Sequence, residues 1–280
     1  MDRHITSDLL AWKEKPSRKP LLVRGARQTG KSYSITHFAK TYFKGKLHLV
    51  NFEKRPDWHA IFKENLSPNR ILSELEILTG NKIVAGEDLL FFDEIQACPK
   101  AIASLRYFFE EVPQLHVIAA GSLLEFALSD IPFPVGRVQI LDLYPMTFTE
   151  FLKATGNPTA ADIISDTPKK LSDAVHNLLI AELKKFLFIG GMPECVKTFA
   201  DTGRMADVFE VQSELIATFR QDFSKYAGRA DKSCMNAVFN AVPQHIGHQI
   251  KYTALADGFT GPTIKNAFEL LEMADRKSVV

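Results

Sequence analysis

Short apolar runs alternate with helical patterns through the first half of the chain. The runs that suit buried parallel strands are residues 20–23, 46–52, 89–92, 115–120 and 138–143. Between the first two runs, Ile35, Phe38 and Ala39 recur at helical spacing, and farther along Pro99 is placed to open another helix. Strands that alternate with helices form a parallel sheet covered on both faces. The pattern therefore predicts an α/β domain over residues 1–150.

The pattern becomes purely helical from about Phe151. One long apolar face is formed by Leu178, Leu179, Leu183, Phe186 and Leu187. A glycine–proline break at 190–194 separates this stretch from the next helix, and a third helical stretch runs near 208–226. We therefore expect an all-α helical lid domain over residues 151–230.

Residues 231–280 carry three short helical segments with a glycine-containing turn before the last, which Pro262 opens. This order is typical of a helix-turn-helix or partial winged-helix-like segment, in which Thr263, Lys265 and Asn266 would face a DNA groove. A helical bundle that contacts protein fits the same pattern, so a DNA partner and a protein partner both stay open. The chain ends too soon after the last helix for two wing strands, and we expect the natural protein to be longer.

Composition narrows these possibilities only a little. A chain of 280 residues with 46% hydrophobic content suits about two domains with sizeable cores. The formal net charge of +1 gives no global basic field, so any nucleic-acid-binding face would be local. Cys98, Cys195 and Cys234 are odd in number and widely spaced, which favours a reducing compartment over disulfides. With no long apolar run and no signal-like N-terminus, we expect a cytoplasmic protein without a membrane partner.

The most specific motif follows the first apolar run. Residues 25–32 match G-x-x-x-x-G-K-[ST], the phosphate-binding loop, between a predicted strand and a predicted helix. Its two glycines let the backbone point successive N–H groups at phosphate oxygens beside a helix N-terminus. Lys31 can reach the β- and γ-phosphates, and the Ser32 hydroxyl can ligate Mg²⁺. The loop therefore predicts ATP binding through Gly25, Ala26, Arg27, Gln28, Thr29, Gly30, Lys31 and Ser32.

A second signal is the acidic pair at the end of the third apolar run. Residues 89–92 bury a strand, so Asp93 emerges at its carboxyl end, where it can bind Mg²⁺ directly or through water. Glu94 is then placed to polarise a water for attack on the γ-phosphate, a general-base role. A strand that ends in a solvated acidic turn is the alternative. GTP is disfavoured because residues 81–84 lack the aspartate of an Asn-Lys-x-Asp pattern.

Several other polar residues are weaker candidates. Ser122 follows the fourth run and is expected to contact the γ-phosphate or the attacking water, or else to cap a helix. Arg137 is a candidate for stabilising charge on the transferring phosphoryl group, from the same subunit or a neighbouring one, and an exposed arginine is the alternative. Arg220 is more typical of an exposed helix charge. No ligand near His245 and His248 completes a metal site, so we interpret both as structural or exposed.

As a set, these motifs resemble those of the bacterial and archaeal AAA+-type ATPases in which a P-loop domain precedes a C-terminal region of undefined function. The matching segments are 24–32, 92–96, 121–122, 136–137, 143–151 and 190–194. The resemblance implies a five-stranded core with extra strands between the phosphate-loop strand and the Asp-Glu strand, a helical lid, a winged-helix segment and a further domain beyond it. Leu123 departs from the family's usual Gly-Ser-Ser at the sensor position.

We therefore expect a P-loop NTPase parallel sheet covered by helices, followed by an all-α lid and a partial winged-helix-like segment. The leading hypothesis is a Mg²⁺-dependent ATPase whose hydrolysis drives or times a conformational change. Its site would use Glu94, Lys31, Arg137 and Ser122 for catalysis, and Ser32 and Asp93 for the metal. A nucleotide-regulated binding protein or DNA-associated switch with negligible turnover is the alternative. A small-molecule kinase is disfavoured by the acidic pair and the large helical half, and oligomer formation stays open.

Overall fold

The computed structural model describes residues 3–122, 134, 136–166, 170–223 and 231–273. The chain falls into two compact units, Arg3–Tyr144, called the sheet unit below, and Pro145–Val280, called the helical unit. This division falls slightly before the boundary expected at residue 150. The second expected boundary, at residue 230, lies outside the described residues and stays a prediction.

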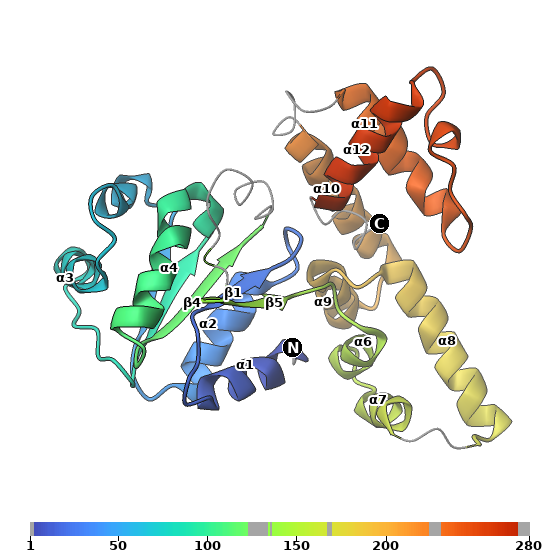
Figure 1. The fold of residues 1–280 in the computed structure, drawn as a ribbon. Coiled ribbons are helices and arrows are strands. Elements are labelled where there is room, and N and C mark those ends of the chain that lie inside the picture. Colours follow the sequence, from blue (N-terminus) through green and yellow to red (C-terminus); the bar gives the residue numbers. More distant parts are fainter. Residues whose placement is uncertain (1–2, 123–133, 135, 167–169, 224–230, 274–280) are drawn as a thin grey trace. The chain divides into compact units, whose positions relative to one another are not determined.

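The sheet unit is built on a five-stranded parallel sheet with the order β2-β3-β4-β1-β5 (Figure 1). Its strands are β1 (Leu21–Arg24), β2 (Leu47–Asn51), β3 (Leu89–Asp93), β4 (His116–Gly121) and β5 (Gln139–Asp142). All five predicted strands are confirmed. Along the chain, β2 lies between β1 and β3. Within the sheet, β4 lies between them, so other strands separate the two as the resemblance implied. The fold is that of a P-loop NTPase.

The sheet is buried because helices cover both of its faces. These elements are α1 (Ile5–Glu14), α2 (Lys31–Tyr42), η1 (Pro56–Phe62), α3 (Pro68–Thr79), η2 (Ile95–Ala97) and α4 (Pro99–Glu111). In β3, Phe91 and Phe92 point to opposite faces, as successive strand residues do, and each joins a different apolar cluster. The cluster of Phe92 holds side chains of α3 and α4, whereas that of Phe91 holds side chains of α1 and α2.

Proline and glycine mark the ends of two of these helices. Pro68 and Pro99 occupy the first positions of α3 and α4, where the missing N–H costs nothing. Gly80 ends α3 with a φ of +66°, a left-handed conformation that glycine adopts without strain. The predicted helix after Pro99 is confirmed, and its Ile102 and Leu105 are fully buried.

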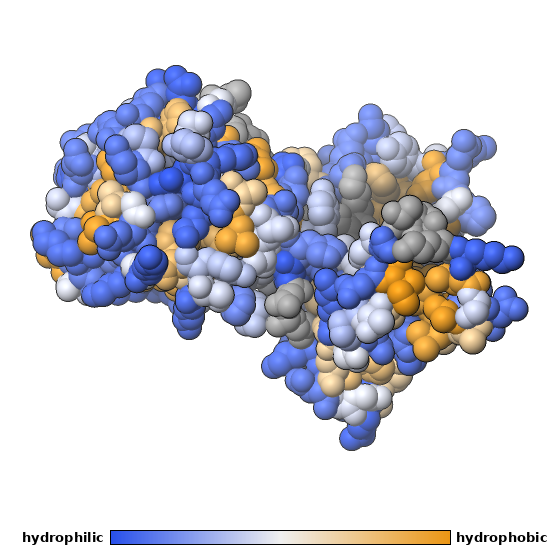
Figure 2. All heavy atoms as spheres, turned by 90° about the horizontal axis from the view of Figure 1, so that it is seen from below, coloured by the Kyte–Doolittle hydropathy of each residue, from blue (hydrophilic) through white to orange (hydrophobic). Residues whose placement is uncertain are grey.

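The helical unit is all-α in its described residues. Its elements are α6 (Phe148–Ala154), α7 (Pro158–Ser165), α8 (Asp173–Ile189), α9 (Pro193–Thr202), α10 (Met205–Asp222), α11 (Lys232–Ala241), η4 (Val242–His245), η5 (Tyr252–Ala254) and α12 (Gly261–Met273). The predicted glycine–proline break separates α8 from α9. Figure 2 shows apolar side chains gathered on the surface of this unit. Its exposed apolar residues include Leu178, Ile180, Leu187, Phe188, Phe209 and Ile216.

The helical unit begins with a tight backbone contact at the turn before α9. The Met146 N–H donates to Gly191 O at 2.6 Å. A Cβ at Gly191 would overlap Met146 O, so only glycine allows this approach. The chain then enters α6 through a capping box, in which Thr147 and Glu150 bond each other's backbone N–H groups. These contacts fix the start of the unit against the turn at 190–192.

The last described segment keeps its predicted helices. Asp231 caps α11 through a bond from the Cys234 N–H at 2.9 Å, and α12 buries Ile264 and Ala267. No strand is present within residues 231–273, so a winged helix is not shown there. Lys265 is exposed and pairs with Glu269 at 3.6 Å. No helix in the described part of the chain is long and apolar enough to cross a membrane.

Candidate nucleotide-binding site

The polar residues singled out by the sequence gather at the carboxyl edge of the sheet. Arg24 of β1 lies in register with Gly121 of β4, and Asn51 of β2 lies in register with Asp93 of β3. The strands therefore end at the same edge, and the phosphate loop, Asp93 and Ser122 leave the sheet together. Ligand sites of open parallel sheets form at this edge.

The phosphate loop has the backbone that its glycines predict. Gly25 has a φ of +153°, and a Cβ there would overlap the Leu143 carbonyl oxygen at the end of the unit. Gly30 has a φ of +89°, and α2 begins at the next residue, so the helix N-terminus faces the loop. Gln28 adopts a φ of +65° without being glycine, a conformation that costs of order 1 kcal/mol and is found most often at functional sites.

Lys31 is buried against the loop that it follows. Its Nζ donates to Gly25 O at 2.8 Å and to Ala26 O at 2.7 Å, and the residue is only 7% exposed. Thr29 forms a hydrogen bond within the loop, in which its Oγ1 donates to Ala26 O at 2.9 Å. The ammonium group is thus held at the loop whose N–H groups are predicted to bind phosphate.

Asp93 lies between two side-chain donors. Ser32 Oγ donates to Oδ1 at 2.8 Å, and Asn51 Nδ2 donates to Oδ2 at 3.0 Å. Burial raises the pKa of Asp93 and the charge of Glu94 adds to the rise, whereas the bonds from Ser32 and Asn51 act against it. A hydroxyl and a buried carboxylate in contact are hard oxygen ligands, and a cation beside them would relieve the burial of negative charge. The two residues therefore fit Mg²⁺.

Glu94 has an unusual backbone and a close side-chain partner. Its φ of +51° and ψ of +45° are left-handed, which is uncommon for a residue with a Cβ. Gln96 Nε2 donates to Glu94 Oε2 at 2.6 Å. Gln96 Oε1 is buried and accepts no hydrogen bond from any described residue. The carboxylate is thus held by a neighbouring amide, directly after the buried end of β3.

Ser122 is buried at the end of β4 and is linked to the phosphate loop. Arg27 Nε donates to Ser122 Oγ at 3.4 Å, and Arg27 Nη2 lies 3.4 Å from Glu53 Oε1. Glu53 follows β2, so Arg27 contacts residues at the ends of two different strands. The structure therefore brings Ser122 together with the loop, and its contact with the γ-phosphate or the attacking water stays a prediction.

Arg137 lies at the other edge of the sheet. It precedes β5, whose first residue, Gln139, pairs with Leu21 at the start of β1. The loop that binds phosphate leaves the far end of β1, so several residues of strand separate the two places. Arg137 Nε instead pairs with Glu110 Oε1 of α4 at 2.9 Å, with both side chains partly exposed. Of the two alternatives for Arg137, this placement disfavours action on the phosphate of its own subunit, and action from a neighbouring subunit stays a prediction.

The structure adds residues that sequence reasoning missed. Asn51 and Gln96 hold the two carboxylates, and Arg3 donates to Thr29 O of the loop at 3.0 Å and to Tyr144 O at 2.8 Å. Arg3 is 8% exposed and joins the loop to the last residue of the sheet unit. Asn51 lies one position before the end of the predicted strand 46–52, and this polar position near a strand end was the available signal. The contacts of Arg3 span 26 and 141 positions of sequence, and no local pattern indicates them.

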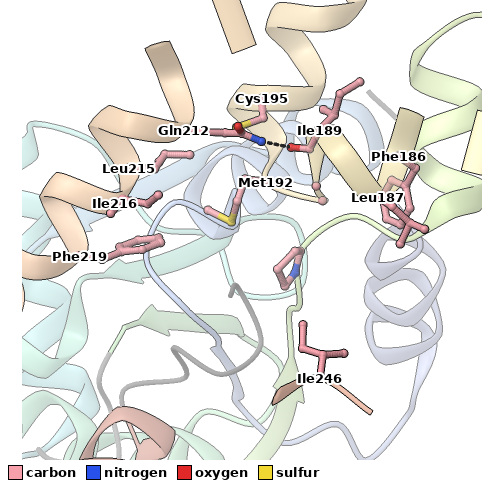
Figure 3. Close-up of a pocket in the computed structure, with 13 residues that line it drawn as sticks. Phe186, Leu187, Ile189, Met192, Cys195, Gln212, Leu215, Ile216, Phe219 and Ile246 are labelled. Atoms are coloured by element: carbon pink, nitrogen blue, oxygen red, sulfur yellow. Dashed lines mark hydrogen bonds between the residues drawn. The ribbon is translucent and has the colours of Figure 1, made fainter. Parts of the chain in front are cut away.

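A cavity lies within the helical unit, apart from the residues described above (Figure 3). This cavity of about 500 Å³ has a mainly apolar lining from α8, α9, α10 and the turn between α8 and α9, with Ile246 from beyond α11. Gln212 is its polar side chain, and it donates to Ile189 O at 3.0 Å (Figure 3). Burial raises the pKa of Cys195 to about 11, so its thiol is not a nucleophile at neutral pH. Among the described residues that line this cavity, none is suited to phosphate chemistry.

The remaining candidates from the sequence lie away from the site. Arg220 Nη2 donates to Asn240 Oδ1 at 2.8 Å, and His245 Nδ1 lies 3.0 Å from Ala241 O. Within the part of the chain that the structure describes, no group of three His, Cys, Asp or Glu side chains could hold a metal. His245 is half-buried and His248 is exposed.

Comparison with known proteins identifies the two halves of the chain. Residues 17–152 match the family model of an AAA domain, and residues 180–276 match that of a domain of unknown function (DUF8612). None of the curated proteins matches the chain.

Solved structures resemble the whole chain at low sequence identity. The Walker-type ATPase PABY2304 of Pyrococcus abyssi is 18% identical, with 98% of this chain and 89% of that chain covered and a TM-score of 0.57. The RuvB Holliday junction branch migration motor of Thermotoga maritima is 16% identical over 98% and 88% of the two chains, with a TM-score of 0.45. At such identities only the fold is shown, and it comes from the first of these. The phosphate loop and the acidic strand end both lie within residues 17–152, the segment that matches an AAA domain.

Proposed function

We propose that the protein binds MgATP at the carboxyl edge of the sheet and hydrolyses it. The contact between Ser32 and Asp93 is the observation that carries this proposal, because it brings the end of the phosphate loop to the end of the acidic strand. Glu94 follows Asp93 directly, so a general base stands beside the expected phosphate site. Ser32 and Asp93 are 61 positions apart in sequence and meet only in the fold.

Each residue of the site has a part in the proposed reaction. The loop N–H groups and Lys31 bind the phosphates, with Lys31 exchanging its bonds to Gly25 O and Ala26 O for phosphate oxygens. Ser32 and Asp93 would hold Mg²⁺, which when bound neutralises charge on the β- and γ-phosphates. Glu94 accepts a proton from the attacking water. Ser122 is proposed to contact the γ-phosphate or that water.

Arg137 enters the proposal only as a residue that acts between subunits. Its position at the amino edge of the sheet supports contact with a nucleotide held by a neighbouring copy rather than by its own chain. Hydrolysis would then time a change in the helical unit, and assembly into an oligomer would be needed for full activity.

A nucleotide-regulated switch with negligible turnover is the second candidate. The bond from Gln96 to Glu94 favours it, because a carboxylate held by an amide is restrained from turning to a water. A DNA partner for the last segment is less well supported, since α12 carries Glu269 and Glu272 beside Lys265. Weak, salt-insensitive association with duplex DNA would count against that partner.

Phosphate release from MgATP by the purified chain, measured beside ATP affinity, tests the proposal. The Glu94→Gln variant should bind ATP as the unaltered chain does and release phosphate at least 100-fold more slowly. Binding without release by either protein would favour the switch. Equal release by both would show that Glu94 is not the base, and phosphate appearing on an added acceptor would indicate a kinase.

A further inference from the structure

We propose that Arg27 supplies, from within the same chain, the positive charge that stabilises the γ-phosphoryl group during hydrolysis. This inference rests on the proposed function and assigns to the third residue of the phosphate loop a role beyond that of the loop backbone. It follows from where the Arg27 side chain lies relative to the ends of the strands.

The side chain of Arg27 crosses the carboxyl edge of the sheet. It starts from the loop after β1, donates to Ser122 at the end of β4, and lies 3.4 Å from Glu53, which follows β2. In the sheet order β2-β3-β4-β1-β5, the strand between β2 and β4 is β3. The contact between Arg27 and Glu53 therefore spans the end of β3, with the two side chains together bridging it. Asp93 and Glu94 leave the sheet there.

In the proposal, the guanidinium lies between the groups that would flank the γ-phosphate. The phosphate loop binds from the side of β1, and the general base approaches from β3. Arg27 belongs to the loop itself and is partly buried, with 24% of its side chain exposed. A guanidinium at such a place can donate two parallel hydrogen bonds to phosphate oxygens.

Three other arginines of the sheet unit are differently placed. Arg3 is bonded to two backbone carbonyl oxygens, and Arg24 is paired with Asp142 of β5, on the side of β1 away from β3. Arg137 lies at the amino edge. Of these arginines, Arg27 has the contacts that lead toward the acidic strand end.

The contacts of Arg27 with Ser122 and Glu53 are suited to replacement by contacts with a phosphate. Both are 3.4 Å long, beyond the usual N–H···O distance of about 2.9 Å. A γ-phosphate carries more negative charge than the Glu53 carboxylate and accepts bidentate bonds, so it would compete well for the guanidinium. Because Ser122 is one of the partners, a shift of Arg27 would also release the Ser122 hydroxyl.

The chemical step balances with groups already named. Water attacks the γ-phosphorus, the bond from that phosphorus to the β,γ-bridging oxygen breaks, and the products are ADP and inorganic phosphate. Glu94 accepts the water proton and later returns it to solvent. Negative charge grows on the leaving oxygen and persists on the γ-oxygens, and Arg27 donates N–H groups to these oxygens.

The test compares Arg27→Gln and Arg27→Lys with Arg24→Gln, an arginine of the same loop region that faces β5. Two quantities are measured for each protein: kcat for phosphate release from MgATP, and the ratio of affinities for ADP and for the non-hydrolysable β,γ-imido analogue of ATP. Tryptophan fluorescence melts show whether each variant is folded, because Trp12 and Trp58 both belong to the sheet unit.

Arg27→Gln should lower kcat about 100-fold and weaken analogue binding about 10-fold while ADP binding changes little. Arg27→Lys should restore part of the analogue affinity but little of kcat, because it keeps the charge and loses the planar fork. Arg24→Gln should leave both quantities unchanged. An equal loss of ADP and analogue affinity, or no change in either, would overturn the proposal. If the unaltered chain releases no phosphate, the proposed hydrolysis is wrong. The ratio of affinities for ADP and for the ATP analogue still tests whether Arg27 contacts the γ-phosphate.

Discussion

His116 makes the stability of the sheet unit depend on pH in a predictable direction. The ring lies at the start of β4 and is 5% exposed, with Trp12 and Phe43 packed edge-on at centroid distances of 6.0 and 4.9 Å. Burial lowers its pKa from 6.5 to about 4, and the charges of Arg18 and Lys13 add to this, against a bond with the Asp88 backbone. The folded ring therefore stays neutral where an unfolded one takes a proton.

The size of the effect follows from the two pKa values. Between pH 6.5 and about 4 the unfolded state binds more protons, so stability falls as the pH falls through this window. At about 1.4 kcal/mol per pKa unit, the full loss below pH 4 is about 3 kcal/mol, and at pH 5 the free energy of unfolding is already about 2 kcal/mol lower than at pH 8. Above pH 6.5 the contribution is complete.

Urea unfolding followed by tryptophan fluorescence at pH 8, 6 and 5 measures this dependence in the sheet unit alone. His116→Phe keeps an aromatic ring in the same contacts and removes the titrating group, so its stability should change about 2 kcal/mol less between pH 8 and pH 5. His37→Gln replaces an exposed histidine and serves as the control. Its stability should depend on pH as that of the unaltered chain does. Parallel curves for the unaltered chain and His116→Phe would refute the reasoning.

Other predictions concern the proposed metal ligands and the close backbone contact of Gly191 in the helical unit. Ser32→Ala should weaken MgATP binding about 10-fold and leave ATP binding in EDTA nearly unchanged, as seen by calorimetry, because only the metal ligand is lost. Removal of Mg²⁺ by EDTA should abolish phosphate release, and continued release would argue against the metal site. Gly191→Ala should destabilise the helical unit by about 1–3 kcal/mol in circular dichroism melts, since its Cβ overlaps Met146 O. Gly261→Ala, whose Cβ would meet only Thr253 at 3.8 Å, should be close to neutral.

Local patterns were sufficient for the elements and for the phosphate loop. Each strand of the sheet is a short apolar run that helices cover on both faces, and such runs can be read without knowing their neighbours. The phosphate loop depends on consecutive residues, with Gly25 and Gly30 in backbone conformations that suit glycine. Asp93 was predictable because it is the first polar residue after a buried strand.

Residues whose role depends on register or on distant partners were harder to predict. Arg137 stands beside a strand in the sequence. Only the pairing of Gln139 with Leu21, at the start of both strands, shows that Arg137 lies at the amino edge of the sheet. The bonds of Arg3 join three separate segments, and the contacts of Arg27 join the ends of β2 and β4 across β3. These are properties of the assembled sheet, which residue spacing along the chain does not contain.

A single-turnover experiment tests ATP hydrolysis at this site most directly. The chain is mixed in excess with radiolabelled MgATP, and the bound nucleotide is separated and identified over time, so slow product release does not hide the chemical step. The unaltered chain is predicted to convert its bound ATP to ADP, whereas Glu94→Gln holds ATP unchanged over the same period. Bound ATP that stays intact on the unaltered chain, or ADP formed equally fast by both proteins, would contradict the assigned reaction.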